Sequence, residues 1–306
     1  MQQKPIVQVE GLRKAYASTV AVEDASFEVY EGEIFGMVGP NGAGKTTTIE
    51  CIEGLRRPDS GHIRVLGLDP QRDGYALRPR IGIQLQESAL QDRIKVWEAL
   101  DLFAGFYPHS MDWQPLVEQL GLADRRNTPF AKLSGGQKQR LFIALALVSD
   151  PEVVFLDELT TGLDPQARRA MWDLVREIRD RGKTVFLTTH FMEEAERLCD
   201  RVAIMDHARI IALDTPENLI RTLGAEYRLV FRVDEPFDLQ RLSSVASISR
   251  VETMGERVVV YGATAGVVSE VVNALAQSGT RLHDLRTEQP TLEDVFLFLT
   301  GREMRD

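Results

Sequence analysis

Residues 39–47 have the types and spacing that bind phosphate, and they fit the pattern G-x-x-x-x-G-K-S/T without departure. The residues of this loop are Gly39, Pro40, Asn41, Gly42, Ala43, Gly44, Lys45, Thr46 and Thr47. Glycine lets backbone N–H groups approach phosphate oxygens, and the helix expected after the loop adds partial positive charge at its N-terminus. Lys45 can reach the β- and γ-phosphates, and Thr46 can offer its hydroxyl to Mg²⁺. The loop therefore predicts nucleotide binding.

Two acidic residues, Asp157 and Glu158, follow the apolar run at 153–156. The run predicts a buried strand of the parallel type, and the two carboxylates project from its carboxyl end. One carboxylate can hold the Mg²⁺ shell beside a phosphate loop, and the other is free to orient and deprotonate a water molecule.

Polar residues also end two further apolar strands, Gln86 after 81–85 and His190 after 184–189. Ligand contacts in α/β proteins occur at the carboxyl ends of sheet strands. Gln86 alone is a weak signal, and a lone histidine is more often a structural group. His190 gains weight because it is the fourth polar strand terminus expected at the same edge.

Residues 134–137, Ser134, Gly135, Gly136 and Gln137, begin a predicted helix in an unusual way. Ser134 is a favourable N-cap, whereas each glycine weakens the first helical turn by about 1 kcal/mol relative to alanine. A purely structural helix has no reason to begin like this. A Ser-Gly-Gly sequence at a helix N-terminus does suit an anion, so we predict an anion seat here.

Two further positions carry more than one interpretation. Asp164 precedes Pro165 and is expected to cap another helix. Tyr16 lies at the expected end of an early strand, upstream of the phosphate loop. Its ring either packs in the core or stacks on adenine, and its position alone does not choose between them.

The elements that must position these groups predict an α/β protein with a phosphate-loop NTPase core. Residues 6–9 and 26–30 indicate a small antiparallel sheet, and residues 90–150 indicate a helical insertion. The pattern restarts after residue 223. We therefore expect a nucleotide-binding domain over 1–223 and a small α/β accessory domain over 224–306, which carries no catalytic motif.

Composition narrows the function classes. The chain has 306 residues, of which 43% are hydrophobic and 27% charged, as in soluble globular proteins. No apolar run approaches the ~18–20 residues that span a bilayer, and the first residues lack the apolar core of a signal peptide. The formal charge of -10 argues against nucleic-acid binding through a broad basic surface. Cys51 and Cys199 match no metal spacing, so buried reduced thiols are expected.

Together these motifs resemble those of the ATP-binding subunits of ATP-binding-cassette (ABC) transporters, over about residues 6–220. The most specific element is Leu-Ser-Gly-Gly-Gln at 133–137, which other phosphate-loop classes lack. Small GTPases would also need an Asn-Lys-x-Asp motif, and the chain has none.

The resemblance implies a role for each polar group, with ATP and Mg²⁺ as cofactors. Tyr16 resembles the adenine-stacking residue, Glu158 the catalytic base, and His190 the switch histidine at the γ-phosphate. Gln86 resembles the Q-loop residue, which would join Thr46 and Asp157 around Mg²⁺ and act in catalysis together with Lys45.

The resemblance also implies an assembly. Ser134–Gln137 would face the phosphate loop of a second protomer, and Asp164 would lie in a loop that crosses the interface. Two ATP molecules would then hold a head-to-tail homodimer. A separately encoded integral-membrane permease would be the other partner, so the chain would be cytoplasmic and peripheral on the inner face of the cell membrane.

One residue departs from the family pattern: Leu159 stands where proline usually follows the catalytic glutamate. Leucine in place of proline is expected to loosen the loop around Glu158, while every polar group remains. We expect activity.

The segments at 164–169, 188–196 and 290–296 resemble the multidrug or daunorubicin-resistance type of exporter ATPase. This predicts export of drugs or other amphiphilic compounds. The alternative is a soluble ABC ATPase that drives a repair, translation or assembly machine. The repair type would bring a long coiled coil and the translation type usually two cassettes, whereas this chain has one phosphate loop and no coiled coil.

Overall fold

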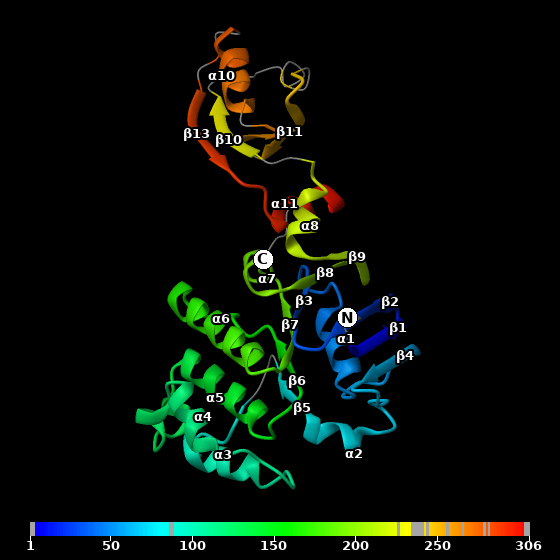
Figure 1. Ribbon diagram of the computed structural model, residues 1–306, viewed down its shortest axis with the longest axis vertical. Helices are drawn as coiled ribbons and strands as arrows, with labels where there is room; N and C mark the ends of the chain where they lie inside the picture. The colour runs from blue at the N-terminus through cyan, green and yellow to red at the C-terminus, as the bar shows by residue number, and fades with distance from the viewer. Residues whose placement is uncertain are drawn as a thin grey trace. The chain divides into compact units, whose positions relative to one another are not determined.

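The structure is a computed structural model (Figure 1), and it describes residues 4–85, 89–224, 227–233, 242, 245–254, 257–264, 266–277, 280 and 282–302. The contacts divide the chain into two compact units, with the division between Thr215 and Pro216. The boundary expected from the sequence lies a few residues later, after helix α8 (Pro216–Arg221), which packs against α11 (Leu292–Thr300) of the second unit.

The first unit is built on a six-stranded sheet in the order β5-β6-β7-β3-β8-β9. All neighbouring strands are parallel except β8 and β9. The strands are β3 (Ile34–Val38), β5 (Ile81–Gln84), β6 (Val153–Asp157), β7 (Thr184–Thr189), β8 (Arg201–Asp206) and β9 (Arg209–Asp214). Every residue of β3, β6 and β7 is buried, as parallel strands with both faces covered require.

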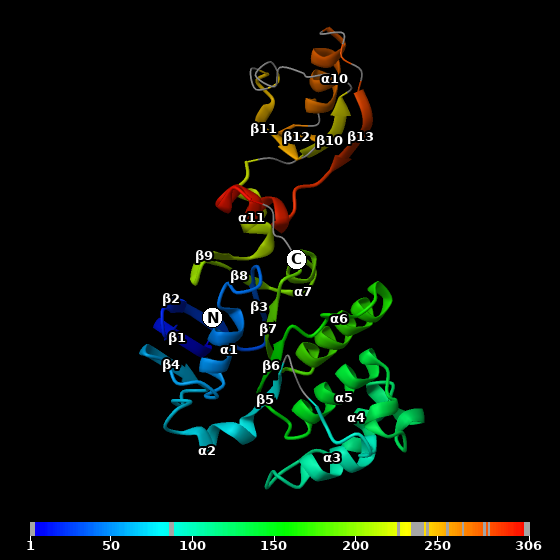
Figure 2. The ribbon, with the colours of Figure 1, turned by 180° about the vertical axis from the view of Figure 1, so that it is seen from behind.

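Helices cover both faces of this sheet. Figures 1 and 2 show α1 (Lys45–Ile52) on one side and α5 (Gly135–Leu147) and α6 (Pro165–Asp180) on the other. Helix α7 (Met192–Leu198) follows β7 and packs near β3. The carboxyl ends of β3, β6 and β7 therefore meet at one edge, where the phosphate loop, the acidic pair and His190 begin.

A second, antiparallel sheet has the order β2-β1-β4, formed by β1 (Pro5–Tyr16), β2 (Thr19–Tyr30) and β4 (Ser60–Val65). Aromatic rings join it to the central sheet. Phe27 of β2 stacks on Phe35 of β3 with ring centroids 5.4 Å apart, and Phe35 contacts Phe186 of β7 at 5.4 Å. This contact fixes the small sheet against the strand that leads into the phosphate loop.

The helical insertion expected over 90–150 contains α3 (Val96–Ala104), α4 (Trp113–Gln119) and α5. Short helical turns connect the other elements: α2 (Gly74–Leu77) and the 3₁₀ turns η1 (Arg78–Arg80), η2 (Ala123–Arg125) and η3 (Phe130–Lys132). Among the described residues, no helix combines the length and the apolar character needed to cross a membrane.

The second unit has its own four-stranded sheet in the order β11-β12-β10-β13. The strands are β10 (Tyr227–Val233), β11 (Ile248–Met254), β12 (Arg257–Gly262) and β13 (Leu282–Glu288). One face packs Phe231 and Val260 against α10 (Val267–Gln277). On the other face Tyr261 donates a hydrogen bond to Asp294 of α11 at 2.7 Å, so both faces of the sheet are anchored to a helix.

Candidate functional site

The phosphate loop lies between β3 and α1, as the sequence predicts, and its glycines are required by close packing. A Cβ added at Gly39 would lie 2.0 Å from the carbonyl oxygen of Met205, and one at Gly44 would lie 2.1 Å from that of Ala21. Gly44 also has φ +108°, a conformation that residues with a side chain rarely adopt. These contacts fold the loop tightly over the N-terminus of α1.

Lys45 is 4% exposed and is held by oxygens of its own loop. Its Nζ donates to the carbonyl oxygens of Gly39 at 2.8 Å and Pro40 at 3.2 Å, and lies 3.5 Å from Oε1 of Glu158. Burial lowers the pKa of Lys45, and the carboxylate of Glu158 opposes that shift. A phosphate oxygen that binds in the loop would replace these acceptors.

Asp157 ends β6 and faces the hydroxyls of two threonines. Its Oδ1 accepts a hydrogen bond from the Thr188 hydroxyl and lies 3.5 Å from Oγ1 of Thr46. Burial raises the pKa of the Asp157 carboxyl, while the hydrogen bond from Thr188 lowers it. A carboxylate and a hydroxyl beside a phosphate loop are the hard oxygen ligands that Mg²⁺ takes together with phosphate oxygens, so these residues fit the metal.

Glu158 is held in a left-handed backbone conformation, with φ +48°. Its N–H donates to the backbone oxygen and to the hydroxyl oxygen of Thr188, both at 3.1 Å. Its side chain accepts a hydrogen bond from Thr161 at 3.2 Å. A strained non-glycine residue of this kind occurs mainly where the surroundings position a functional group.

His190 completes the cluster. Its Nδ1 lies 3.3 Å from Oε2 of Glu158, and its ring centroid lies 4.0 Å from that of Phe191. Glu158 therefore lies between Lys45 on one oxygen and His190 on the other. The structure brings together five of the residues singled out from the sequence: Lys45, Thr46, Asp157, Glu158 and His190.

The sequence analysis did not single out Thr188 or Thr161. Thr188 pairs directly with Asp157 in the β6–β7 register and contacts both acidic residues. Its signal was present, because a threonine next to the end of a buried strand beside an acidic strand end is unusual. The register of the two strands, which makes the contact, is not readable from one sequence.

Tyr16 is the last residue of β1 and is 39% exposed, so it is not a core residue. Cations flank its ring, with Lys14 Nζ 5.5 Å and Arg56 Cζ 5.2 Å from the centroid. The exposed aromatic face remains a candidate for stacking on a base.

Ser134 is the N-cap of α5, as the sequence predicts. Its hydroxyl accepts from the Gln137 N–H at 3.4 Å, and the Gln137 side chain accepts from the Ser134 N–H at 3.0 Å. Ser134 and Gly135 are exposed. A Cβ added at Gly135 would meet no heavy atom within 4 Å among the described residues, so packing inside this chain does not require glycine there.

Asp164 caps α6 through Oδ1, which accepts from the N–H groups of Gln166 at 3.0 Å and Ala167 at 2.9 Å.

Leu159, at the departure from the family pattern, is 4% exposed, so its side chain packs into the interior beside Glu158. The fifth strand ends at Gln84, two residues earlier than expected, and Gln86 lies outside the described residues.

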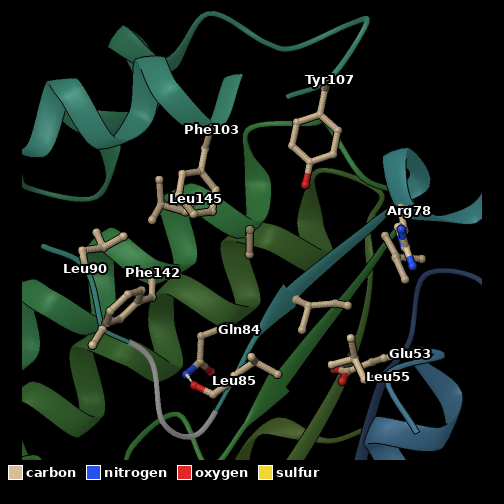
Figure 3. A pocket seen from close by; sticks show the side chains of 14 residues that line it. Glu53, Leu55, Arg78, Gln84, Leu85, Leu90, Phe103, Tyr107, Phe142 and Leu145 are labelled. Carbon is tan, nitrogen blue, oxygen red and sulfur yellow. Dashed lines mark hydrogen bonds between the residues drawn. The ribbon is translucent and has the colours of Figure 1, made fainter. Parts of the chain in front are cut away.

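A groove of about 530 Å³ lies between the end of α1, β5, α3 and α5 (Figure 3). Its upper wall in the figure carries Phe103 and Tyr107, and its floor carries Gln84, Leu85 and Glu53. The groove thus reaches from the helical insertion to the far end of the phosphate-loop helix.

Comparisons with known proteins cover the whole chain. A family model described as "ABC transporter" matches residues 22–161. The chain is similar to Nod factor export ATP-binding protein I of Ralstonia nicotianae, with 40% identity over 313 residues that cover 99% of this chain and 96% of that protein. It is also similar to daunorubicin resistance ATP-binding protein DrrA3 of Streptomyces coeruleorubidus, with 36% identity over 98% of this chain and 97% of that protein.

A solved structure described as the ATP-binding subunit of an ABC transporter has the same fold, with a TM-score of 0.65 and 31% identity. It covers 72% of this chain and 93% of its own. The similarity to the curated proteins extends over the second unit as well.

Proposed function

The chain belongs to the ATP-binding subunits of ABC transporters and is an ATPase, and from this premise we propose that it powers export through a separate membrane subunit. The export relatives are similar over nearly the full length, which favours this class over a soluble repair, translation or assembly machine. The relatives are named for Nod factor export and daunorubicin resistance, which supports export of a drug or another amphiphilic compound.

The observation that carries the proposal is the Lys45–Glu158–His190 cluster at the phosphate loop, in which Lys45 and Glu158 are buried. When ATP binds, the ammonium group of Lys45 would exchange its contacts with Glu158 and the loop carbonyl oxygens for contacts with the phosphates. Glu158, released from Lys45, would then orient and deprotonate the attacking water while His190 contacts the γ-phosphate. Mg²⁺, held by Thr46 and Asp157 with Gln86, would neutralise charge on the phosphate oxygens.

The dimer part of the proposal rests on the opening of α5. Ser134 and Gly135 are exposed, and Gly135 faces open space among the described residues. A phosphate of ATP bound to a second protomer can approach the N–H groups of this first turn because no Cβ blocks them. Asp164, exposed at the N-cap of α6, would contact the same interface.

The membrane subunit would dock in the groove of Figure 3. Exposed apolar residues on α3 and just after it, Leu102 at 50% and Phe106 at 66%, extend the apolar surface beyond the groove. Gln86 follows β5, whose residues line the groove, so closure at the nucleotide would reach the partner through this segment.

The test is Glu158→Gln, which keeps the shape of the side chain and removes the base. We expect ATP turnover to fall about 10²–10⁴-fold, the usual contribution of a general base. The matched control is Glu193→Gln, an exposed carboxylate of α7, which should keep wild-type turnover. Wild-type turnover by Glu158→Gln would contradict the assigned base.

Light scattering of Glu158→Gln with and without Mg-ATP tests the dimer separately. We expect an ATP-dependent shift from monomer to dimer. A monomer in both conditions would mean that the chain alone does not form the shared site, and the roles of Ser134 and Asp164 across an interface would be withdrawn.

A further inference from the structure

Glu53 is a carboxyl group in an unfavourable position on the floor of the groove (Figure 3). It follows α1 as its C-cap residue and is 5% exposed. Neither of its carboxylate oxygens has a hydrogen-bond partner in the part of the chain that the structure describes. A buried carboxyl without a partner costs free energy, so its presence calls for a reason.

The surroundings of Glu53 make its charge more costly still. The charges that act on its carboxyl are those of Asp157 and Glu50, both negative. Burial, followed by these two carboxylates, raises its pKa well above the usual value. The C-terminus of α1 adds the negative end of a helix dipole.

Gln84 presents a second acceptor without a partner in the same groove. Its side chain is 2% exposed, and its Nε2 donates to the carbonyl oxygen of Leu85 at 2.6 Å. This bond leaves Oε1 as the acceptor, and Oε1 has no partner among the described residues. Two neighbouring elements, α1 and β5, therefore supply unsatisfied acceptors and no matching donor.

The walls of the groove are apolar. They are lined by aromatic and aliphatic side chains, including Phe103, Tyr107, Phe142 and Leu145. An occupant that satisfies such a site presents apolar side chains to the walls and a hydrogen-bond donor with positive charge to the floor.

We propose that Glu53 and Gln84 receive a lysine or arginine side chain from the segment of the membrane subunit that docks in this groove. The inference rests on the proposed function, since it names the chemistry by which that partner is recognised. A donor with two or more N–H groups satisfies both residues at once. The apolar walls hold the rest of the segment, and the charge pair selects a partner with a basic residue at that position.

The position of Glu53 also connects docking to the nucleotide site. Lys45 begins α1 and Glu53 caps its end, about 12 Å away at the rise of an α-helix. The charge of Asp157, which we propose to hold Mg²⁺, contributes in turn to the raised pKa of Glu53. Helix α1 therefore links the proposed docking position to the nucleotide site.

The experiment compares Glu53→Gln with Glu31→Gln, the same substitution at an exposed carboxylate outside the groove. Binding to the separately encoded membrane subunit, reconstituted in lipid nanodiscs, is measured for both variants and the wild type. We expect Glu53→Gln to weaken binding about tenfold or more and Glu31→Gln to stay within about twofold. Without the membrane subunit, Glu53→Gln should keep wild-type ATP turnover and a Tm at or above that of the wild type.

The source of the cation is identified from the partner side. Each lysine and arginine in the cytoplasmic segments of the membrane subunit is replaced by methionine in turn. One replacement should weaken binding of the wild-type chain and have little further effect on Glu53→Gln, because the two residues form one pair. Arg78→Gln tests whether the cation that pairs with Glu53 comes from the chain itself, since Arg78 is exposed at the same groove.

Three results would overturn the inference while leaving the proposed function in place. The first is unchanged binding of Glu53→Gln to the membrane subunit. The second is a lower Tm of Glu53→Gln without the membrane subunit, which means that Glu53 has a partner inside the chain. The third is weaker binding of Arg78→Gln when no lysine or arginine of the membrane subunit is coupled to Glu53. Failure of the wild-type chain to bind the membrane subunit at all would instead overturn the proposed function, and the inference with it.

Discussion

Thr188 is the residue on which both acidic groups of the site depend. Its hydroxyl donates to Asp157, and its two oxygens accept from the N–H of Glu158. These bonds hold Glu158 in its left-handed conformation, which costs about 1–3 kcal/mol in other proteins. The catalytic geometry therefore belongs to strand β7 as much as to the acidic pair itself.

Thr188→Val keeps the size of the side chain and removes its hydroxyl. We expect turnover to fall at least about tenfold, because Asp157 and Glu158 lose a bond that positions them. The control is Thr184→Val on the same strand, whose hydroxyl oxygen accepts from the N–H of Gly32 away from the site. Steady-state ATPase kinetics of both variants test this prediction. An equal loss of turnover in the two variants would contradict it.

Glu53 gives a prediction for the dependence of stability on pH. Its folded pKa lies above the unfolded value, so the folded chain holds the extra proton between the two values. Stability conferred by that proton is lost as the pH rises through this interval. Glu53→Gln removes the loss, so its Tm advantage over the wild type should grow as the pH rises above about 4.5, the usual value for this carboxyl group. A constant difference, measured by thermal unfolding, would contradict this.

Single residues were the part of the site most open to prediction. The phosphate loop and the strand-end residues Asp157, Glu158 and His190 carry a signal because their types and positions are unusual. The left-handed φ of Glu158 has no signal in the sequence, and neither has the lack of a hydrogen-bond partner for Glu53 among the described residues. Both depend on what packs around them in three dimensions.

At the scale of elements, two glycine-containing turns differ in what requires the glycine. In the loop before α1, backbone oxygens of Met205 and Ala21 lie against Gly39 and Gly44. At the start of α5, open space lies beside Gly135. The first glycines are required by contacts within the chain, whereas Gly135 leaves room among the described residues for the phosphate that we propose to bind there.

Gly44→Ala and Gly135→Ala should therefore fail in different ways. Gly44→Ala should destabilise the fold, because its Cβ meets backbone and its φ is unfavourable. Gly135→Ala should raise helix stability by up to about 1 kcal/mol and still lower ATP turnover, since its Cβ blocks the proposed phosphate approach. Chemical unfolding and ATPase assays of both variants test the pair. Wild-type ATP turnover by Gly135→Ala would contradict the proposed anion site at the start of α5.

Helix starts were predicted well, and strand limits less so. Ser134 and Asp164 are the N-caps expected, because capping chemistry is local. Strand β1 continues to Tyr16, well past the predicted residue 9, through charged residues such as Arg13 and Lys14. Its pairing with β2 contains register shifts, which break the alternation that identifies a strand.

At the scale of the whole molecule, the two units have separate cores. The core of the second unit is anchored by Asp294, whose Oδ1 accepts from Tyr261 at 2.7 Å and lies 2.9 Å from Nε of Arg228. Burial and this carboxylate raise the pKa of Tyr261 to about 12. Asp294 is buried, whereas Arg228 is partly exposed and also pairs with Glu288.

Asp294→Asn should destabilise the second unit by about 1–3 kcal/mol, because it weakens the hydrogen bond from Tyr261 and the ion pair with Arg228. Calorimetry should show two unfolding transitions, and only that of the second unit should shift to lower temperature. Glu293→Gln, an exposed neighbour on α11, should leave both within about 0.5 kcal/mol. A shift of the whole profile would contradict two independent cores.

The existence of a second α/β unit followed from the restart of the pattern near residue 223, whereas the strand orders did not follow from the sequence. β3 lies between β7 and β8, and β10 pairs with β13. Such pairings join segments far apart in the chain, and one sequence does not record them. α8 joins the second unit through α11, another contact of that kind.

Both native cysteines of the chain are buried. Cys51 is 0% exposed and burial raises its pKa to about 11, and Cys199 packs so closely that a Cβ on Gly36 would lie 2.5 Å from its sulfur. Thiolate is the species that reacts with maleimides, so neither side chain offers a labelling site in the folded protein. A cysteine introduced at exposed Ala123 would carry a fluorophore without removal of the native thiols. The wild-type background is therefore ready for single-molecule energy-transfer measurements of one protomer meeting another.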